Sequence, residues 1–271
     1  MAKLSISNAW NETSLFLGRE ARLVAPIALL LIAIPGIAVQ LLGPQDDANP
    51  GAAELILGLV LLFASTIAGL IGAIAITHLA LRPGASVREA LGVGLRRFFP
   101  LLVSSLLIGL VFGILAILLM TLFAGSVLER GVINPAEMAT TLMPIVAILT
   151  ILGVALWVRF MLMTPVVTAE PVGPIGIIRR SFALTSGHYW RLLGMVLLLL
   201  LVAVVTLIAV SLVLGISLAL LFGPPVPGSA TWIINGIIST LFQAILTVIL
   251  AVLVARIYAQ LSGTVNPQVF T

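Results

Sequence analysis

Charge is scarce in this chain. Only 8% of its 271 residues are charged, against about 25% in a soluble domain, while 61% are apolar and the mean hydropathy is +1.30. A water-soluble domain is therefore excluded, and the composition predicts an integral membrane protein. Cysteine is absent, which excludes disulfides, thiolate nucleophiles and cysteine-based metal sites.

Catalytic signatures are also missing. The sequence contains no HExxH pair, no GxSxG elbow and no Walker loop. Its two histidines, His78 and His188, lack the acidic cluster that would complete a metal site. We therefore expect no enzyme activity, no catalytic residue, no cofactor and no metal. A lipid-modifying enzyme that uses Glu170 and His188 is an alternative hypothesis.

Long apolar runs dominate what is present. A spanning helix needs about 20 apolar residues, and six runs reach that length. They are unbroken rather than alternating, which argues against a membrane barrel. The sequence predicts an all-α polytopic bundle with six transmembrane helices, near residues 22–43, 53–80, 100–124, 141–166, 192–223 and 231–260.

A shorter amphipathic segment precedes each pair of apolar runs. These segments begin at Ser5, Ser86 and Ile175, and their apolar residues recur every three or four positions. The pattern predicts three cytoplasmic interfacial helices. It also predicts a single membrane domain over residues 1–271, with three parallel units of interfacial helix plus hairpin at 1–81, 82–170 and 171–271. Duplication and convergence on an amphipathic pattern both explain the similarity of the units.

The cations predict an orientation. If both termini are cytoplasmic, all Lys and Arg residues except Arg130 lie on or near the inner side. We therefore expect a multi-pass protein of the bacterial inner (cytoplasmic) membrane with both termini in the cytoplasm. Basic loops beside anionic headgroups explain the pI of about 10.7 better than nucleic acid does. The expected partners are membrane lipids with anionic headgroups, and no nucleic acid; a second copy or another membrane protein is a further candidate.

Polar residues concentrate between residues 159 and 194. Arg159 falls near the inner end of the fourth apolar run, and Glu170 falls where the chain is expected to leave the membrane. An acid at that boundary needs a partner, so we expect Glu170 to pair with Arg159, Arg180 or Arg191. These four residues are the candidate charge network.

The sixth apolar run carries a polar stripe. Its members repeat every four residues: Asn235, Ser239, Gln243 and Thr247. An amide without a partner in hydrocarbon costs several kcal/mol, so the stripe is expected to face the bundle interior. It either joins helices by hydrogen bonds or lines a path for a solute.

A longer motif runs through the same polar window. Its residues are Arg159, Pro165, Glu170, Gly173, Pro174, Arg180, Ser181, Leu184, Thr185, Gly187, Trp190 and Arg191. This pattern resembles the signature of the glycerophosphoryl diester phosphodiesterase membrane-domain family and of related uncharacterised bacterial multi-pass inner-membrane families. The resemblance implies a membrane bundle. Some members of that family are fused to a soluble phosphodiesterase barrel; this sequence holds no such barrel, so the activity is not expected here.

Together these features predict a non-enzymatic inner-membrane protein. Its basic cytoplasmic surface is expected to engage anionic lipid or a protein partner, with a role in envelope or lipid homeostasis. The alternative is a transporter or channel component that uses the polar stripe of the sixth helix.

Overall fold

The computed structural model describes residues 4–44, 51–129 and 135–263, so Lys3 and Arg130 lie outside the described part of the chain. Within it every regular element is helical, which confirms the all-α prediction. The elements are α1 (Ile6–Ala28), the π-helical turn η1 (Leu29–Ala33), α2 (Ile34–Leu42), α3 (Ala52–Leu81), α4 (Val87–Glu129), α5 (Pro135–Phe160), α6 (Met163–Ala169), α7 (Pro174–Ser186), α8 (Tyr189–Phe222) and α9 (Ala230–Ser262).

Six helical stretches are long and apolar enough to cross a membrane, in agreement with the six predicted spans. Much of their surface is apolar and uncovered by protein. The 34-residue helix α8 is the extreme case, because it buries only Leu192, Met195 and Val196. Lipid is the solvent in which such a surface is stable. The chain is therefore a multi-pass membrane protein.

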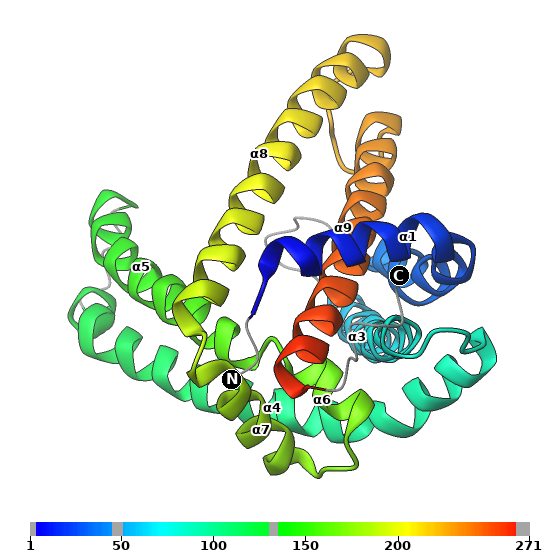
Figure 1. Ribbon diagram of the computed structural model, residues 1–271. Coiled ribbons are helices and arrows are strands. Elements are labelled where there is room, and N and C mark those ends of the chain that lie inside the picture. Colours follow the sequence, from blue (N-terminus) through cyan, green and yellow to red (C-terminus); the bar gives the residue numbers. More distant parts are fainter. Residues whose placement is uncertain (1–3, 45–50, 130–134, 264–271) are drawn as a thin grey trace.

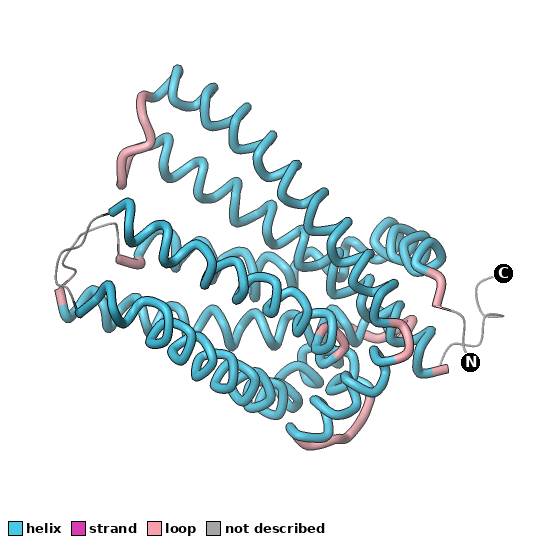
Figure 2. Tube along the Cα trace, turned by 90° about the vertical axis from the view of Figure 1, so that its left-hand side faces the viewer, coloured by secondary structure: helices cyan, strands magenta, loops and turns pink. Residues whose placement is uncertain are grey.

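The spans run between two ends of the molecule (Figure 2). At the hairpin end, the chain turns from α2 into α3, from α4 into α5 and from α8 into α9. The basal end holds the starts of α1, α4 and α8 and the ends of α3, α6 and α9. From the basal end, α5 and α8 diverge toward the hairpin end (Figure 1).

The amphipathic segments do not all form separate helices. Only the third is independent, as α7; the first two continue directly into spanning helices as parts of α1 and α4. The expected breaks are absent because the prolines there are accommodated within helices, as membrane helices allow. Pro100 lies inside α4, and the π-helical turn η1 lies between Pro26 and Pro35.

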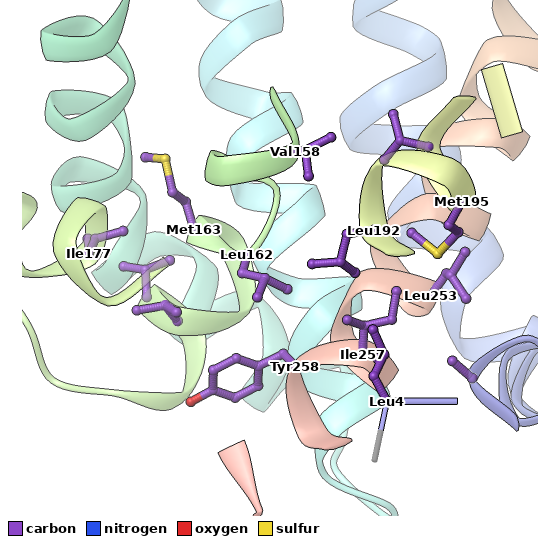
Figure 3. Packing of buried hydrophobic residues seen from close by; sticks show 14 of the residues in the cluster. Leu4, Val158, Leu162, Met163, Ile177, Leu192, Met195, Leu253, Ile257 and Tyr258 are labelled. Carbon is purple, nitrogen blue, oxygen red and sulfur yellow. The ribbon is translucent and has the colours of Figure 1, made fainter. Parts of the chain in front are cut away.

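The core lies toward the basal end. Figure 3 shows side chains of its larger cluster, including Leu162, Leu192, Leu253, Ile257 and Tyr258. These residues come from the α5–α6 connection, α8 and α9, which are distant in sequence. Their packing ties the second and third hairpins together and fixes the surface on which α7 lies.

Candidate functional site

Glu170 follows α6 directly, at the basal end, where it joins three helices. Its Oε1 atom accepts a hydrogen bond from Arg180 Nε of α7 at 3.1 Å and from the Tyr258 hydroxyl of α9 at 2.8 Å. Its backbone oxygen accepts a third hydrogen bond, from Arg97 Nη1 of α4, at 3.0 Å. The sequence left three arginines open as partners of Glu170, and the structure pairs the acid with Arg180.

Sequence reasoning missed two members of this site, Arg97 and Tyr258. Tyr258 is separated from Glu170 by 88 residues, and its side chain is nearly fully buried. The sequence did single out Tyr258, since it is one of only two tyrosines and lies two residues after Arg256, near the C-terminal end of its helix. The sequence alone gave no reason to connect that end to Glu170.

Arg159 lies in a separate environment from the Glu170 carboxylate. Its guanidinium carbon is 4.5 Å from the centre of the Phe182 ring and 4.5 Å from that of Tyr189. A cation between two ring faces is stabilised by both. The Nη1 atom is buried and has no hydrogen-bond partner in the described part of the chain. Arg159 therefore holds α7 and α8 against α5 by stacking rather than by an ion pair.

Backbone contacts anchor α7 on the bundle. The Ser181 hydroxyl donates to the carbonyl oxygen of Arg159 at 2.8 Å, and the Ser104 hydroxyl of α4 donates to that of Pro174 at 3.0 Å. Ile177, Ser181 and Thr185 form the buried face of the helix. The opposite side of α7 faces outward.

Exposed cations and exposed apolar side chains occur together on that outer side and on the first turn of α8. Arg179 and Arg191 are exposed, and their side chains make no hydrogen bond or ion pair within the described residues. Beside them Ile175 is 67% exposed and Trp190 79% exposed. We call this set, with Phe182, the α7 surface. Such a mixture suits the boundary between headgroups and acyl chains.

One family model, described as "Domain of unknown function (DUF7847)", matches residues 5–261. The chain belongs to this family. The searches of curated proteins and of solved structures gave no match. The DUF7847 match covers nearly the whole bundle and includes every residue of the Glu170 site. It provides no link to the glycerophosphoryl diester phosphodiesterase membrane-domain family, so that resemblance stays a prediction.

In this DUF7847 chain the polar stripe of α9 does not face the interior throughout. Gln243 is exposed, and Asn235 and Ser239 are only half-buried, so the expectation of an inward-facing stripe is wrong at Gln243. The buried face of α9 lies one position further along, at Gly236, Ala244 and Val248. These smaller or more apolar residues allow closer packing against α1 and α2.

The last member of the stripe, Thr247, has a different setting. Its hydroxyl donates to the carbonyl oxygen of Gln243 at 2.8 Å, within its own helix. Together with Thr77 and Thr164 it lines a largely apolar cavity of about 260 Å³ between α3, α6, α8 and α9. The stripe as a whole therefore does not outline a continuous polar path.

Neither histidine is bonded to the Glu170 carboxylate within the described part of the chain. His78 is buried, and its Nε2 atom is 3.3 Å from Glu89 Oε1 of α4. No hydrogen bond joins the His188 ring to Glu170 among the described residues. Over the same residues no group of three or more His, Asp or Glu side chains could hold a metal ion.

Proposed function

We propose that this protein is a non-enzymatic component of the bacterial inner membrane that binds anionic phospholipid through the α7 surface. On this proposal it acts in envelope or lipid homeostasis, with lipid headgroups or a protein partner as its ligands. The resemblance to phosphodiesterase membrane domains agrees with a lipid-associated role and adds no catalytic step.

The supporting observation is the α7 surface itself. Among the described residues no acid pairs with Arg179 or Arg191, while Glu170 is already engaged by Arg180 and Tyr258. These exposed guanidinium groups are therefore free to bind an anion from outside the chain. The neighbouring Ile175, Phe182 and Trp190 would insert among acyl chains at the depth where the phosphates lie.

The same proposal includes an orientation. The basal end would face the cytoplasm, with both termini on that side, because the arginines would then meet the more anionic leaflet. The three units of hairpin would share this orientation. The transporter alternative receives less support, since exposure of Gln243 interrupts the inward-facing polar stripe that it would use.

Native mass spectrometry in mild detergent tests the proposal. The protein is mixed with equal amounts of phosphatidylglycerol and phosphatidylcholine, and the retained lipids are counted. Each surface cation contributes about 1 kcal/mol, so removing two in Arg179→Ala/Arg191→Ala should weaken phosphatidylglycerol binding about 30-fold at low salt. Both residues are exposed, so folding should be unaffected.

The matched control is Arg179→Lys/Arg191→Lys, which keeps both charges. It should retain most of the phosphatidylglycerol. Equal phosphatidylglycerol retention by the wild type and the alanine variant would contradict the proposal, as would a wild-type protein that does not prefer the anionic lipid.

A further inference from the structure

A second charged site lies at the basal end, away from the α7 surface. It is a pocket of about 180 Å³ between α1, the turn from α3 to α4, and α9. Five charged side chains line it: Glu12, Arg19, Glu20, Arg82 and Arg256. They come from three separate parts of the chain, so their convergence was not visible in the sequence.

Arg256 forms the inner wall of this pocket. Arg256 is only 6% exposed and lies within a membrane-spanning helix, where burying a cation costs free energy. The guanidinium carbon is 5.4 Å from the centre of the Phe16 ring, and the charge of Glu12 acts on it. A buried cation in a membrane-spanning segment indicates a functional site by default.

The outer part of the pocket holds charges that are not satisfied internally. Arg19, Glu20 and Arg82 form no hydrogen bond or ion pair from their side chains within the described residues. Arg19 and Arg82 are exposed, and Glu20 is half-buried. These three side chains thus share the outer pocket without pairing with one another, which leaves charges of both signs available to a ligand.

The apolar lining indicates where the ligand comes from. Leu15, Leu23 and Leu79 complete the walls, and Leu15 is 60% exposed on the outer side of α1. The pocket therefore has an apolar border next to a membrane-spanning helix. A lipid whose chains remain in the bilayer could place its headgroup here without leaving the membrane.

We propose that this pocket binds a headgroup that carries a phosphate and a primary ammonium a few bonds apart, as ethanolamine phospholipids do. Arg19 and Arg82 bind the phosphate, and Glu12 or Glu20 accepts hydrogen bonds from the ammonium. A ligand with only negative charge would leave the two carboxylates without a donor, and one with only positive charge would be repelled by the three guanidinium groups, which outnumber the carboxylates. A headgroup with both charges satisfies both sets.

The test compares phosphatidylethanolamine with phosphatidylcholine of the same acyl chains, by native mass spectrometry of the purified full chain. The choline ammonium has no N–H group and cannot donate to a carboxylate. Since charge-assisted hydrogen bonds are the strong ones, wild-type protein should retain phosphatidylethanolamine about tenfold better. Glu12→Gln/Glu20→Gln should remove that preference. Equal retention of the two lipids by the wild type, or a preference that survives in this variant, would overturn the proposal.

A second variant keeps the test decisive if loss of both acids prevents folding. Arg82→Ala removes an exposed residue of the turn, and Arg88→Ala is its control, exposed on α4 and outside the pocket. Arg82→Ala should lower phosphatidylethanolamine retention severalfold relative to Arg88→Ala, and equal retention by the two variants would refute the site. Phosphatidylglycerol retention, assigned to the α7 surface, should stay unchanged in both variants.

Competition with soluble phosphoethanolamine shows whether the ligand of the pocket comes from the membrane or from the aqueous phase. If the membrane supplies the ligand, millimolar phosphoethanolamine should displace little of the retained phosphatidylethanolamine. Complete displacement together with loss of binding in Glu12→Gln/Glu20→Gln would support the pocket chemistry and assign its ligand to the aqueous phase.

Discussion

Glu170 is the residue at which three helices meet. One carboxylate oxygen accepts from both Arg180 and Tyr258, and the backbone oxygen accepts from Arg97. The Arg180 side chain is 45% exposed and that of Glu170 is 25% exposed, so solvent screens the ion pair. The hydrogen bond to Tyr258 is better shielded from solvent, because Tyr258 is buried. Glu170 is therefore a positioning residue that holds α7 near α9.

At the residue scale, Glu170→Gln should lower the free energy of unfolding by about 1–2 kcal/mol and Tyr258→Phe by about 1 kcal/mol. The double variant should lose less than the sum, because both changes act on the same hydrogen bond: the glutamine oxygen still accepts from the Tyr258 hydroxyl, but more weakly than a carboxylate does. Denaturant unfolding in mild detergent measures all three.

The other tyrosine provides a matched control. The Tyr189 hydroxyl lies 3.5 Å from the Ala155 carbonyl oxygen, which is long for a hydrogen bond. Tyr189→Phe should therefore lower the free energy of unfolding by less than Tyr258→Phe does. Strictly additive effects of Glu170→Gln and Tyr258→Phe would show that the two side chains act independently.

Whether a contact of the site could be predicted depends on how far apart its two residues lie in the sequence. The need of Glu170 for a cation follows from its position at a membrane boundary, and Arg180 is only ten residues away. Tyr258 could not be assigned, because its contact depends on how α9 packs beside α6. Arg159 was placed in the same network on charge alone, and two aromatic rings provide its environment instead.

At the element scale, the crossing of α3 and α4 depends on a glycine. A Cβ atom at Gly94 would lie 2.8 Å from the backbone oxygen of Ile71 and 3.0 Å from its Cγ2 atom. Backbone cannot move aside as a flexible side-chain end can. The α4 segment that precedes the membrane is therefore held directly against α3.

Gly94→Ala should destabilise the protein by about 1–3 kcal/mol through overpacking of this crossing. Gly92→Ala is the matched control on the same helix, because a Cβ atom there meets nothing within 4 Å. It should be neutral, or stabilising by up to about 1 kcal/mol through higher helix propensity. Thermal unfolding in detergent compares the two; equal destabilisation would contradict the close approach.

The number and type of the elements were predictable, but their continuity was not. Hydropathy located all six spans, because lipid imposes long apolar runs. Whether Pro100 ends a helix depends on tertiary support, and the nearby Ser104 hydroxyl accordingly bonds the carbonyl oxygens of both Pro100 and Pro174. The sequence could not show that support, so α4 was expected as two helices.

At the scale of the whole molecule, charge is segregated along the bundle. The Glu170 site, the α7 surface and the pocket at Arg256 all lie at the basal end, whereas the described hairpin end carries few charges. Two lipid sites on one end would let a single protein sample an anionic and an ethanolamine headgroup in the same leaflet. Both lipid assignments require the basal end to face the cytoplasm.

Cysteine accessibility in intact cells tests that requirement most directly, since the chain has no native cysteine to interfere. Single cysteines are introduced at Val226, exposed at the hairpin end, and at Ser186, the exposed last residue of α7. Spheroplasts are then treated with a membrane-impermeant maleimide. With the basal end in the cytoplasm, Val226→Cys should be labelled in intact spheroplasts and Ser186→Cys only after lysis. Labelling of Ser186→Cys from outside, with protection of Val226→Cys, would contradict that orientation.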